Sequence, residues 1–417
     1  MSDTEETVLP DVAERFIRYA GHDTSSDGSS ASSPSTARQM DFLRMLREEL
    51  EDLGMEDVEL DESGTLYATL PGEGAGRTVI GLLAHVDTSP EAPGEGVVPV
   101  IHRSWDGGPI RLRGDVSIDP AMTEHMNRYA GGTIITSDGN TLLGVDDKAG
   151  VALIMEACRA LINDPGIRRP PMRVAFTTDE EVGRGMDGFD AERFGADMAY
   201  TVDGGPVGKV DIQTFNAWSA QFRVLGREVH PGSAKGIMVN AVRIISDMVS
   251  FLRPEEMPEN SSGDEGYIYP MHISSSTSEG TLRVILRDFT SDGMERKIRY
   301  MKSLEGWINS RYPGADITLE LLEQYSNPAE ILKRDRRAVD FALMGTRAAG
   351  LQPEESSIRG GTDGSRLSFM GVPTVNLPTG GEFYHSRKEW VAVEGLQLSL
   401  DILMETLKIW GGEQSAP

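Results

Sequence analysis

A strand-length apolar run at residues 78–87, TVIGLLAHVD, constrains the fold of this chain more than any other segment. Successive side chains of a strand point to opposite faces, so a run that is apolar throughout is buried on both faces. A segment with helical periodicity follows at 147–162, and further strand-like runs follow at 172–181 and 198–204. This alternation of strand and helix predicts an α/β domain built on a mainly parallel sheet that helices cover.

Imidazole or carboxylate side chains follow the ends of several strand-like segments along the chain. In an open α/β sheet, ligands bind beyond the carboxyl ends of the strands. We therefore predict that these side chains meet at one site. They supply the nitrogen and oxygen ligands that are typical of a hydrolytic zinc centre. The residues are His85, Asp87, Asp146, Glu180, Glu181, Asp203 and His385.

Two of these motifs also have simpler interpretations when each is taken alone. His85 and Asp87 are two residues apart at a strand end, so both side chains point to the same side. Asp87 is then placed to accept a hydrogen bond from the ring nitrogen that His85 turns away from a metal. Asp146 stands before the helix at 147–162, where a carboxylate can give one oxygen to each of two cations about 3.5–4 Å apart. An acid before a helix is more often an N-cap, and a lone His-x-Asp is more often structural.

The neighbouring acids Glu180 and Glu181 predict a division of labour. Strand alternation sends their side chains to different places, so one binds a metal and the other faces the reacting bond as a general base. The alternative is an acidic pair that merely begins a solvated turn. Asp203 precedes a pair of glycines and His385 follows another, and glycines let the backbone approach a site closely.

Charge links the separate motifs. The carboxylates of Asp146, Glu181 and Asp203 carry three negative charges that would repel one another within a few ångströms, and some would take up protons. Two zinc ions carry four positive charges. They would resolve this conflict and leave one positive charge to stabilise a hydroxide and then a tetrahedral oxyanion.

The chain of 417 residues exceeds the size of one ordinary core, and its pattern predicts two domains. From about residue 213 the expected elements follow the order β-α-β-β-α-β, which is typical of a ferredoxin-like domain. The α/β alternation of the first domain then resumes, with helices expected at 329–349 and 394–410 and a strand at 374–378. We therefore predict a catalytic domain at 1–212 and 328–417 that is interrupted by an inserted domain at 213–327. The Ser-rich segment 24–36 is predicted to be a loop without bearing on the chemistry.

Composition excludes several classes of partner. The formal net charge of −26 would repel a phosphate backbone, so nucleic acid is a poor partner. No apolar run approaches the length that crosses a bilayer, and the acidic first residues lack the apolar region of a secretory signal. The single cysteine, Cys158, precludes an internal disulfide and predicts core packing in a reducing cytoplasm.

Taken together, the motifs resemble those of the peptidase T family, the tripeptide aminopeptidases of the zinc peptidase superfamily that includes carboxypeptidase G. The matching segments are RFIRYAGHDTSS, HVDTSP, TLLGVDDKAG, VAFTTDEEVGRG, AYTVDGG, VHPGSAKGIMVNA, IRGGTDGSRLSFMG and NLPTGGEFYH. The resemblance implies a zinc-peptidase catalytic domain of the mainly parallel α/β class with an inserted ferredoxin-like α+β lid domain.

The resemblance also implies two Zn²⁺ per subunit. One zinc would be held by His85, Asp146 and Asp203, and the other by Asp146, Glu181 and His385. Glu180 would be the general base and Asp87 a second catalytic acid. The family pattern further implies a cis peptide bond between Asp146 and Asp147.

On the substrate side, the resemblance assigns roles to residues of the inserted domain and one residue beyond it. His230 would reach toward the scissile carbonyl, and Asn240 and Arg287 would hold the substrate carboxylate. Arg359 is a further candidate, and the alternative for Arg287 is an ordinary strand-surface residue. A homodimer formed through the lid domain is one expected arrangement. The other is a monomer whose lid edge is blunted by charge.

The function that follows is release of the amino-terminal residue from tripeptides by zinc-activated water. Two alternatives keep the fold. One is a di-zinc dipeptidase or N-acyl amino acid amidohydrolase of the same superfamily, since no residue that reads a free α-amine is evident. The other is a noncatalytic binding protein, against which the intact candidate ligands and base speak.

Overall fold

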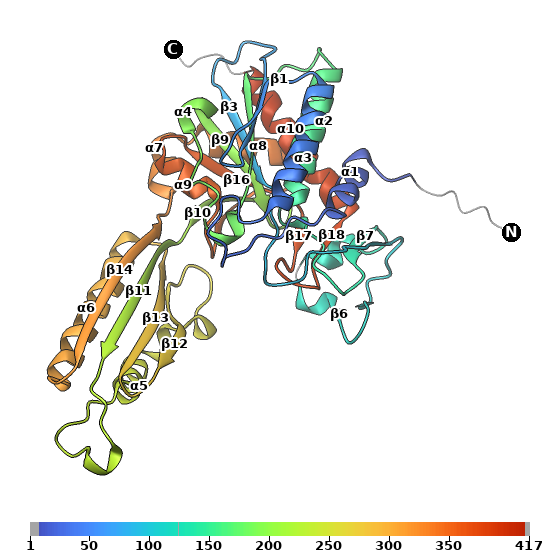
Figure 1. The fold of residues 1–417 in the computed structure, drawn as a ribbon. Helices are drawn as coiled ribbons and strands as arrows, with labels where there is room; N and C mark the ends of the chain where they lie inside the picture. The colour runs from blue at the N-terminus through green and yellow to red at the C-terminus, as the bar shows by residue number, and fades with distance from the viewer. Residues whose placement is uncertain (1–7, 124, 413–417) are drawn as a thin grey trace. The chain divides into compact units, whose positions relative to one another are not determined.

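The computed structural model describes residues 8–123 and 125–412, which belong to two compact units (Figure 1). The first unit extends to Ile212 and resumes over Glu330–Ser356 and from Thr362 on, and the second comprises Gln213–Ala329 with Ser357–Gly361. The short segment Ser357–Gly361 therefore groups with the inserted unit, whereas the expected boundary left it outside. The reason is Arg359, whose guanidinium donates hydrogen bonds to the carbonyl oxygens of Gly263 and Glu265 in that unit.

The first unit is built on a mixed sheet whose centre is parallel. Strands β8, β3, β9 and β16 pair in parallel, and antiparallel pairs flank them on both sides. The predicted parallel core is thus confirmed, with an antiparallel margin at each edge. In spatial order the strands are β1 (Glu56–Leu60), β2 (Leu66–Leu70), β8 (Met172–Thr177), β3 (Ile80–His85), β9 (Met198–Gly204), β16 (Thr374–Pro378), β10 (Lys209–Thr214) and β15 (Glu354–Ile358).

Alternating residues of the central strands bury both faces of this sheet. Leu82 and Ala84 enter the main apolar cluster, whereas Leu83 between them enters a smaller cluster on the other face. The main cluster includes residues of α1 (Asp11–Ala20), α2 (Ala37–Leu53), α3 (Val145–Asn163), α8 (Arg337–Ala348) and α10 (Val393–Gly412). The smaller cluster includes residues of α4 (Ala191–Phe194) and α9 (Asp363–Phe369). Cys158 is fully buried in α3, as predicted.

Several short elements escaped the sequence patterns. The expected helix at 329–349 is two helices, α7 (Ala329–Arg334) and α8, because an Asp335 turn separates them. A further sheet of four short strands has the order β17 (Gly381–Glu382), β18 (Trp390–Ala392), β7 (Ile134–Ser137) and β4 (Pro99–His102), and β5 (Ile110–Arg111) pairs with β6 (Ser117–Ile118). The loop between β17 and β18 carries His385, so this small sheet helps to place a candidate ligand.

The second unit has the predicted ferredoxin-like order. Its antiparallel sheet runs β12-β13-β11-β14, and α5 and α6 pack against it to enclose a separate apolar core (Figure 1). Helix α5 begins at Ala241, because the Asn240 side chain accepts a hydrogen bond from the Val242 amide and caps the helix. The elements are β11 (Asn216–Leu225), α5 (Ala241–Phe251), β12 (Tyr267–Ser275), β13 (Glu279–Asp288), α6 (Ser291–Arg311) and β14 (Asp316–Tyr325).

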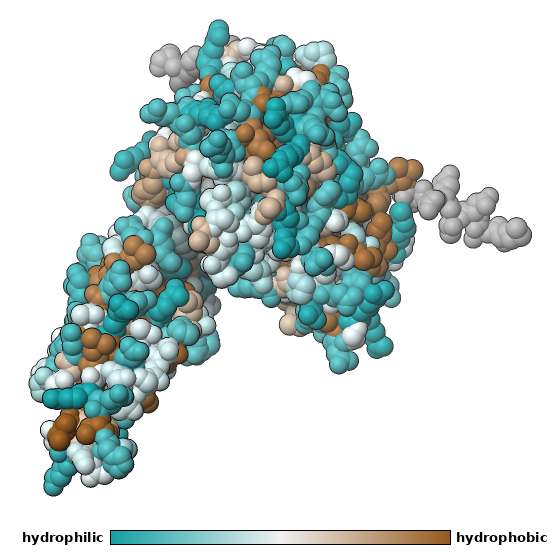
Figure 2. Space-filling model, in the orientation of Figure 1, coloured by the Kyte–Doolittle hydropathy of each residue, from teal (hydrophilic) through white to brown (hydrophobic). Residues whose placement is uncertain are grey.

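The surface agrees with the charge of the chain. The face drawn in Figure 2 is mostly hydrophilic, with apolar side chains in small groups, as 66 acidic and 40 basic residues lead one to expect. Across the part of the chain that the structure describes, no helix combines the length and apolar character needed to span a membrane.

Candidate metal centre and active site

Asp146 lies between two imidazoles and presents one carboxylate oxygen to each. His85 Nε2 is 2.9 Å from Asp146 Oδ1, and His385 Nε2 is 3.1 Å from Asp146 Oδ2. His85 Nε2 also lies 3.7 Å from Asp203 Oδ1, and His385 Nε2 lies 2.8 Å from Glu181 Oε2. The structure therefore brings all five predicted metal ligands into one cluster, with Asp146 at its centre.

The backbone that delivers Asp146 is held by an acid that the sequence patterns did not single out. The buried carboxylate of Glu389 accepts hydrogen bonds from the amides of Leu143, Gly144 and Asp146 at 2.6–3.0 Å. The Asp146–Asp147 peptide bond is cis, as the resemblance implied. The sequence offers one sign that Glu389 is buried, because this acid stands directly before the apolar run WVAV. Nothing in that run predicted its partners.

Asp87 holds the segment that carries the paired glutamates. Its carboxylate accepts hydrogen bonds from the amides of Glu180 at 3.0 Å and Glu181 at 3.2 Å. His85 Nδ1 lies 3.4 Å from Asp87 Oδ1 but only 3.0 Å from the Asp87 carbonyl oxygen. The carbonyl is thus the nearer acceptor for the imidazole, and the carboxylate mainly fixes the glutamate-bearing turn.

Glu180 and Glu181 do not continue the strand, so strand alternation does not orient them. Strand β8 ends at Thr177, and the two acids lie on a single turn of 3₁₀ helix, Glu180–Val182, that follows Asp179 at a φ of 62°. Successive residues of a 3₁₀ helix are about 120° apart, so the two side chains still diverge. Glu181 reaches His385, whereas no described imidazole is recorded within ion-pair distance of Glu180.

Burial and the proximity of the acids to one another shift the pKa values of the clustered side chains. Burial and the neighbouring Asp146 carboxylate raise the pKa of Glu181 to about 8 and the pKa of Asp203 to about 7. Burial also raises the pKa of Glu180 well above its usual value. Burial opposes the charged form of His385, but Asp146 and Glu181 outweigh it and raise its pKa to about 11. The cluster therefore favours added positive charge, which protons or metal cations can supply.

The donor set fits divalent cations. Ligand atoms of His85, Asp146 and Glu181 lie within 4.8 Å of one another. Glu181 Oε1 is buried and has no hydrogen-bond partner among the described residues, so it is free to bind a cation. Asp147 also lies near His85, but its oxygens already accept the amides of His85 and Gly150. Asp146 is therefore the better ligand of the two neighbours.

We expect zinc to reverse the pH dependence of stability. Without metal, the raised carboxyl pKa values mean that the folded state binds more protons than the unfolded state between about pH 5 and pH 8, so the free energy of unfolding falls as pH rises. The raised His385 pKa acts in the same direction above its unfolded value. With excess zinc, metal replaces those protons and stabilisation grows with pH. Urea unfolding at several pH values, with chelator or with zinc, measures both slopes, and slopes of the same sign would contradict the assignment.

The four predicted substrate residues do not converge within the second unit. His230 and Asn240 lie beyond the Leu225 end of β11, where Arg227 bridges Val239. Arg287 pairs with Ala217 at the other end of that strand and covers the Tyr325 ring. The Arg359 guanidinium lies over the ring of Phe215, the residue directly before the first residue of β11. Since a strand rises about 3.3 Å per residue, the ten residues of β11 put the two pairs on the order of 25 Å apart.

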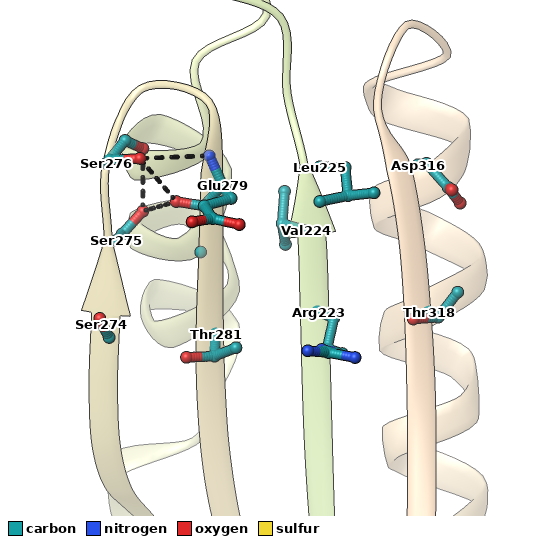
Figure 3. Close-up of a pocket in the computed structure, with 11 residues that line it drawn as sticks. Arg223, Val224, Leu225, Ser274, Ser275, Ser276, Glu279, Thr281, Asp316 and Thr318 are labelled. Atoms are coloured by element: carbon teal, nitrogen blue, oxygen red, sulfur yellow. Dashed lines mark hydrogen bonds between the residues drawn. The ribbon is translucent and has the colours of Figure 1, made fainter.

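The second unit also carries a hollow of about 690 Å³ at one end of its sheet (Figure 3). Figure 3 shows its lining side chains on the four strands, with the helices behind the sheet. Arg223, Glu279 and Asp316 supply its charges, and hydroxyls of Ser274, Ser275 and Ser276 supply much of the rest. None of the described residues that line it is an imidazole or a predicted site residue.

Comparison with known proteins assigns the family. Residues 134–409 match the family described as Peptidase family M20/M25/M40. The chain belongs to this peptidase family. It is 43% identical over 409 residues to Peptidase T of Geobacillus kaustophilus, which covers 97% of this chain and 99% of the relative. It is 39% identical over 401 residues to Peptidase T of Clostridium perfringens strain 13, at 96% and 98% coverage.

Solved structures of two peptidases share the fold. The aminopeptidase PepT of Bacillus cereus matches with a TM-score of 0.74 at 23% identity, covering 96% of this chain and 99% of that chain. A tripeptidase of Staphylococcus aureus matches with a TM-score of 0.76 at 22% identity, covering 97% and 99%. These findings confirm the family and the fold class that the sequence motifs predicted.

Proposed function

We propose that this M20 peptidase is a cytoplasmic metallo-aminopeptidase that releases the amino-terminal residue from tripeptides. The observation that carries the proposal is the Asp146 carboxylate, which presents one oxygen to His85 and the other to His385 with Glu181 and Asp203 beside them. Full-length identity of 43% to a Peptidase T supports the tripeptide substrate. A chain with one cysteine suits a reducing compartment.

Two zinc ions are the proposed cofactors. His85, Asp146 and Asp203 would hold one, and Asp146, Glu181 and His385 would hold the other. Zinc supplies a Lewis acid for the scissile carbonyl and lowers the pKa of bound water. The buried, otherwise unpartnered Glu181 Oε1 and the excess of acids are the features of this chain that suit a pair of cations.

Glu180 is the proposed general base. It lies beside Glu181 in the turn that Asp87 holds by two amide hydrogen bonds, and burial raises its pKa well above the usual range of a carboxyl group, which suits proton transfer. In this role Glu180 takes a proton from the attacking water and returns it to the leaving amine. Asp87 contributes by fixing the direction of the turn and by lying against the His85 imidazole.

His230, Asn240, Arg287 and Arg359 are proposed to bind the substrate, with a second copy of the chain completing the set. An extended tripeptide spans at most about 11 Å, whereas the two pairs in one chain are on the order of 25 Å apart. A homodimer formed through the second unit, in which one pair comes from each copy, meets this requirement. Sedimentation analysis tests it directly, and a monomeric active enzyme would contradict it.

A substrate series tests the proposed function. With zinc restored after chelation, we expect Ala-Ala-Ala to yield free Ala and Ala-Ala, with kcat/KM at least about tenfold above that for Ala-Ala, a difference worth about 1.4 kcal/mol. Chelation should abolish cleavage. Faster hydrolysis of Ala-Ala would instead indicate a dipeptidase, and preference for N-acetyl-Ala an N-acyl amino acid amidohydrolase. Metal binding without any hydrolysis would indicate a noncatalytic protein.

A further inference from the structure

We propose that Gln39 and Ser35 are positioning residues that aim the turn bearing Glu180 and Glu181, by holding the carboxylate of Asp179. The proposal rests on the proposed function, because that function gives those two glutamates their roles. It concerns a part of the chain, the Ser-rich segment and the start of α2, that the sequence motifs left without a chemical role.

Asp179 needs to be held because its backbone is unfavourable. Its φ of 62° places a residue with a side chain in the left-handed region, directly before Glu180. This region is disfavoured for a non-glycine residue, and contacts to its side chain and amide stabilise it there. The directions of the next two side chains therefore depend on the contacts of Asp179 as well as on the amide hydrogen bonds to Asp87.

Gln39 and Asp179 form a reciprocal pair. Gln39 Nε2 donates to Asp179 Oδ1 at 2.7 Å, and the Asp179 amide donates to Gln39 Oε1 at 3.0 Å. Gln39 is 0% exposed and Asp179 is 1% exposed, so water does not compete for these bonds. One side chain thus fixes both the backbone and the carboxylate of the strained residue.

Further groups donate hydrogen bonds to the Asp179 carboxylate or lie within ion-pair distance of it. The Ser35 amide donates to Asp179 Oδ2 at 2.7 Å, and the Ser35 hydroxyl donates to Oδ1. Arg184 Nη2 lies 3.5 Å from Oδ2, and Arg184 Nη1 donates to the carbonyl oxygens of Ser30 and Ser32. The turn and the Ser-rich segment are therefore joined from both sides.

The same segment is also joined to the strand end that carries Asp87. The Ser26 amide donates to the Thr88 carbonyl at 3.1 Å, and Ser25 bridges Thr88 in parallel. Asp87 in turn accepts the amides of Glu180 and Glu181. Residues 24–39 thus contact both loops that deliver the catalytic acids. This arrangement fixes the distance between the loops.

Gln39→Met tests the proposal, because it removes both hydrogen bonds at similar side-chain volume. We expect kcat on Ala-Ala-Ala to fall at least about tenfold with KM within about threefold, since Gln39 acts on the geometry of the turn and not on substrate. The matched control is Gln397→Met in α10, where the amide donates to Asp401 Oδ1 one helical turn away. The control should keep kcat within about twofold of wild type.

Kinetic constants are compared per folded molecule, using circular dichroism and the thermal midpoint. Equal kcat for Gln39→Met and Gln397→Met would overturn the proposal. If Gln39→Met does not fold, Ser35→Ala is used instead. It removes the hydroxyl bond to Asp179 together with the bonds that this hydroxyl accepts from the Asp27 amide and from Gln39 Nε2. A kcat equal to that of wild type would then overturn the proposal. If wild-type protein cleaves no peptide, the proposed function fails. Chelator competition then decides the positioning role through zinc affinity. Gln39→Met should weaken zinc binding about tenfold, and unchanged affinity would overturn the proposal.

Discussion

Glu180→Ala should lower kcat on a tripeptide by about 10²–10⁴-fold while the protein keeps its full content of metal. The five proposed ligand side chains remain in this variant, whereas the proposed general base is lost. KM should change little, because Glu180 is assigned to the reacting atoms and not to the ends of the substrate. Steady-state kinetics and elemental analysis of the same preparation measure both quantities.

A matched control for this variant is Glu192→Ala, which removes an exposed glutamate from α4 of the same unit. It should retain wild-type kcat and metal. Turnover by Glu180→Ala near the wild-type rate would remove its role as base. Loss of metal together with activity would instead make Glu180 a ligand.

Asp146→Ala should abolish both turnover and tight metal binding. Its two oxygens face different imidazoles, so one substitution damages both ligand sets at once. The variant should also lose the stabilisation that zinc gives the wild type, which is about 4 kcal/mol at a free zinc concentration of 1,000 times Kd. Zinc titration and thermal unfolding with and without zinc measure these effects.

Asp164→Ala is the corresponding control, since Asp164 is an exposed acid just past the C-terminus of the same helix α3. It should bind zinc as the wild type does. If Asp146→Ala also bound two equivalents at wild-type affinity, the bridging role of Asp146 would be wrong.

The main sheet and the cluster at its strand ends were predictable because both follow from local patterns. Strand β3 is apolar on both faces and ends at His85, and a parallel neighbour ending beside it delivers its own acids to the same edge. The helix α3 repeats apolar residues over several turns, which no other element type explains. Residue type and strand position together were enough to predict that these imidazoles and acids meet, whereas the assignment of five of them as ligands came from the family resemblance.

Other features depend on contacts that no local pattern encodes. Strands β17 and β18 have only two and three residues, too few for a period to appear. Gln39 and Asp179 are 140 positions apart in the sequence. Glu389 lies 243 positions from Asp146, whose amide donates a hydrogen bond to the Glu389 carboxylate. Such pairs arise from how the elements pack. The separation of His230 from Arg287 likewise follows from the length and register of β11, which residue type alone does not reveal.

The wide spacing of the ligands along the chain bears on how the protein is made. His385 follows Asp146 by 239 positions and lies between β17 and β18, which come late in the sequence and join the earlier strand β7. Under the proposed ligand sets, a nascent chain emerging from the ribosome holds three ligands of the first cation well before it holds the last ligand of the second. The ligand set of the second ion is therefore complete only after His385 has been synthesised, later than that of the first ion.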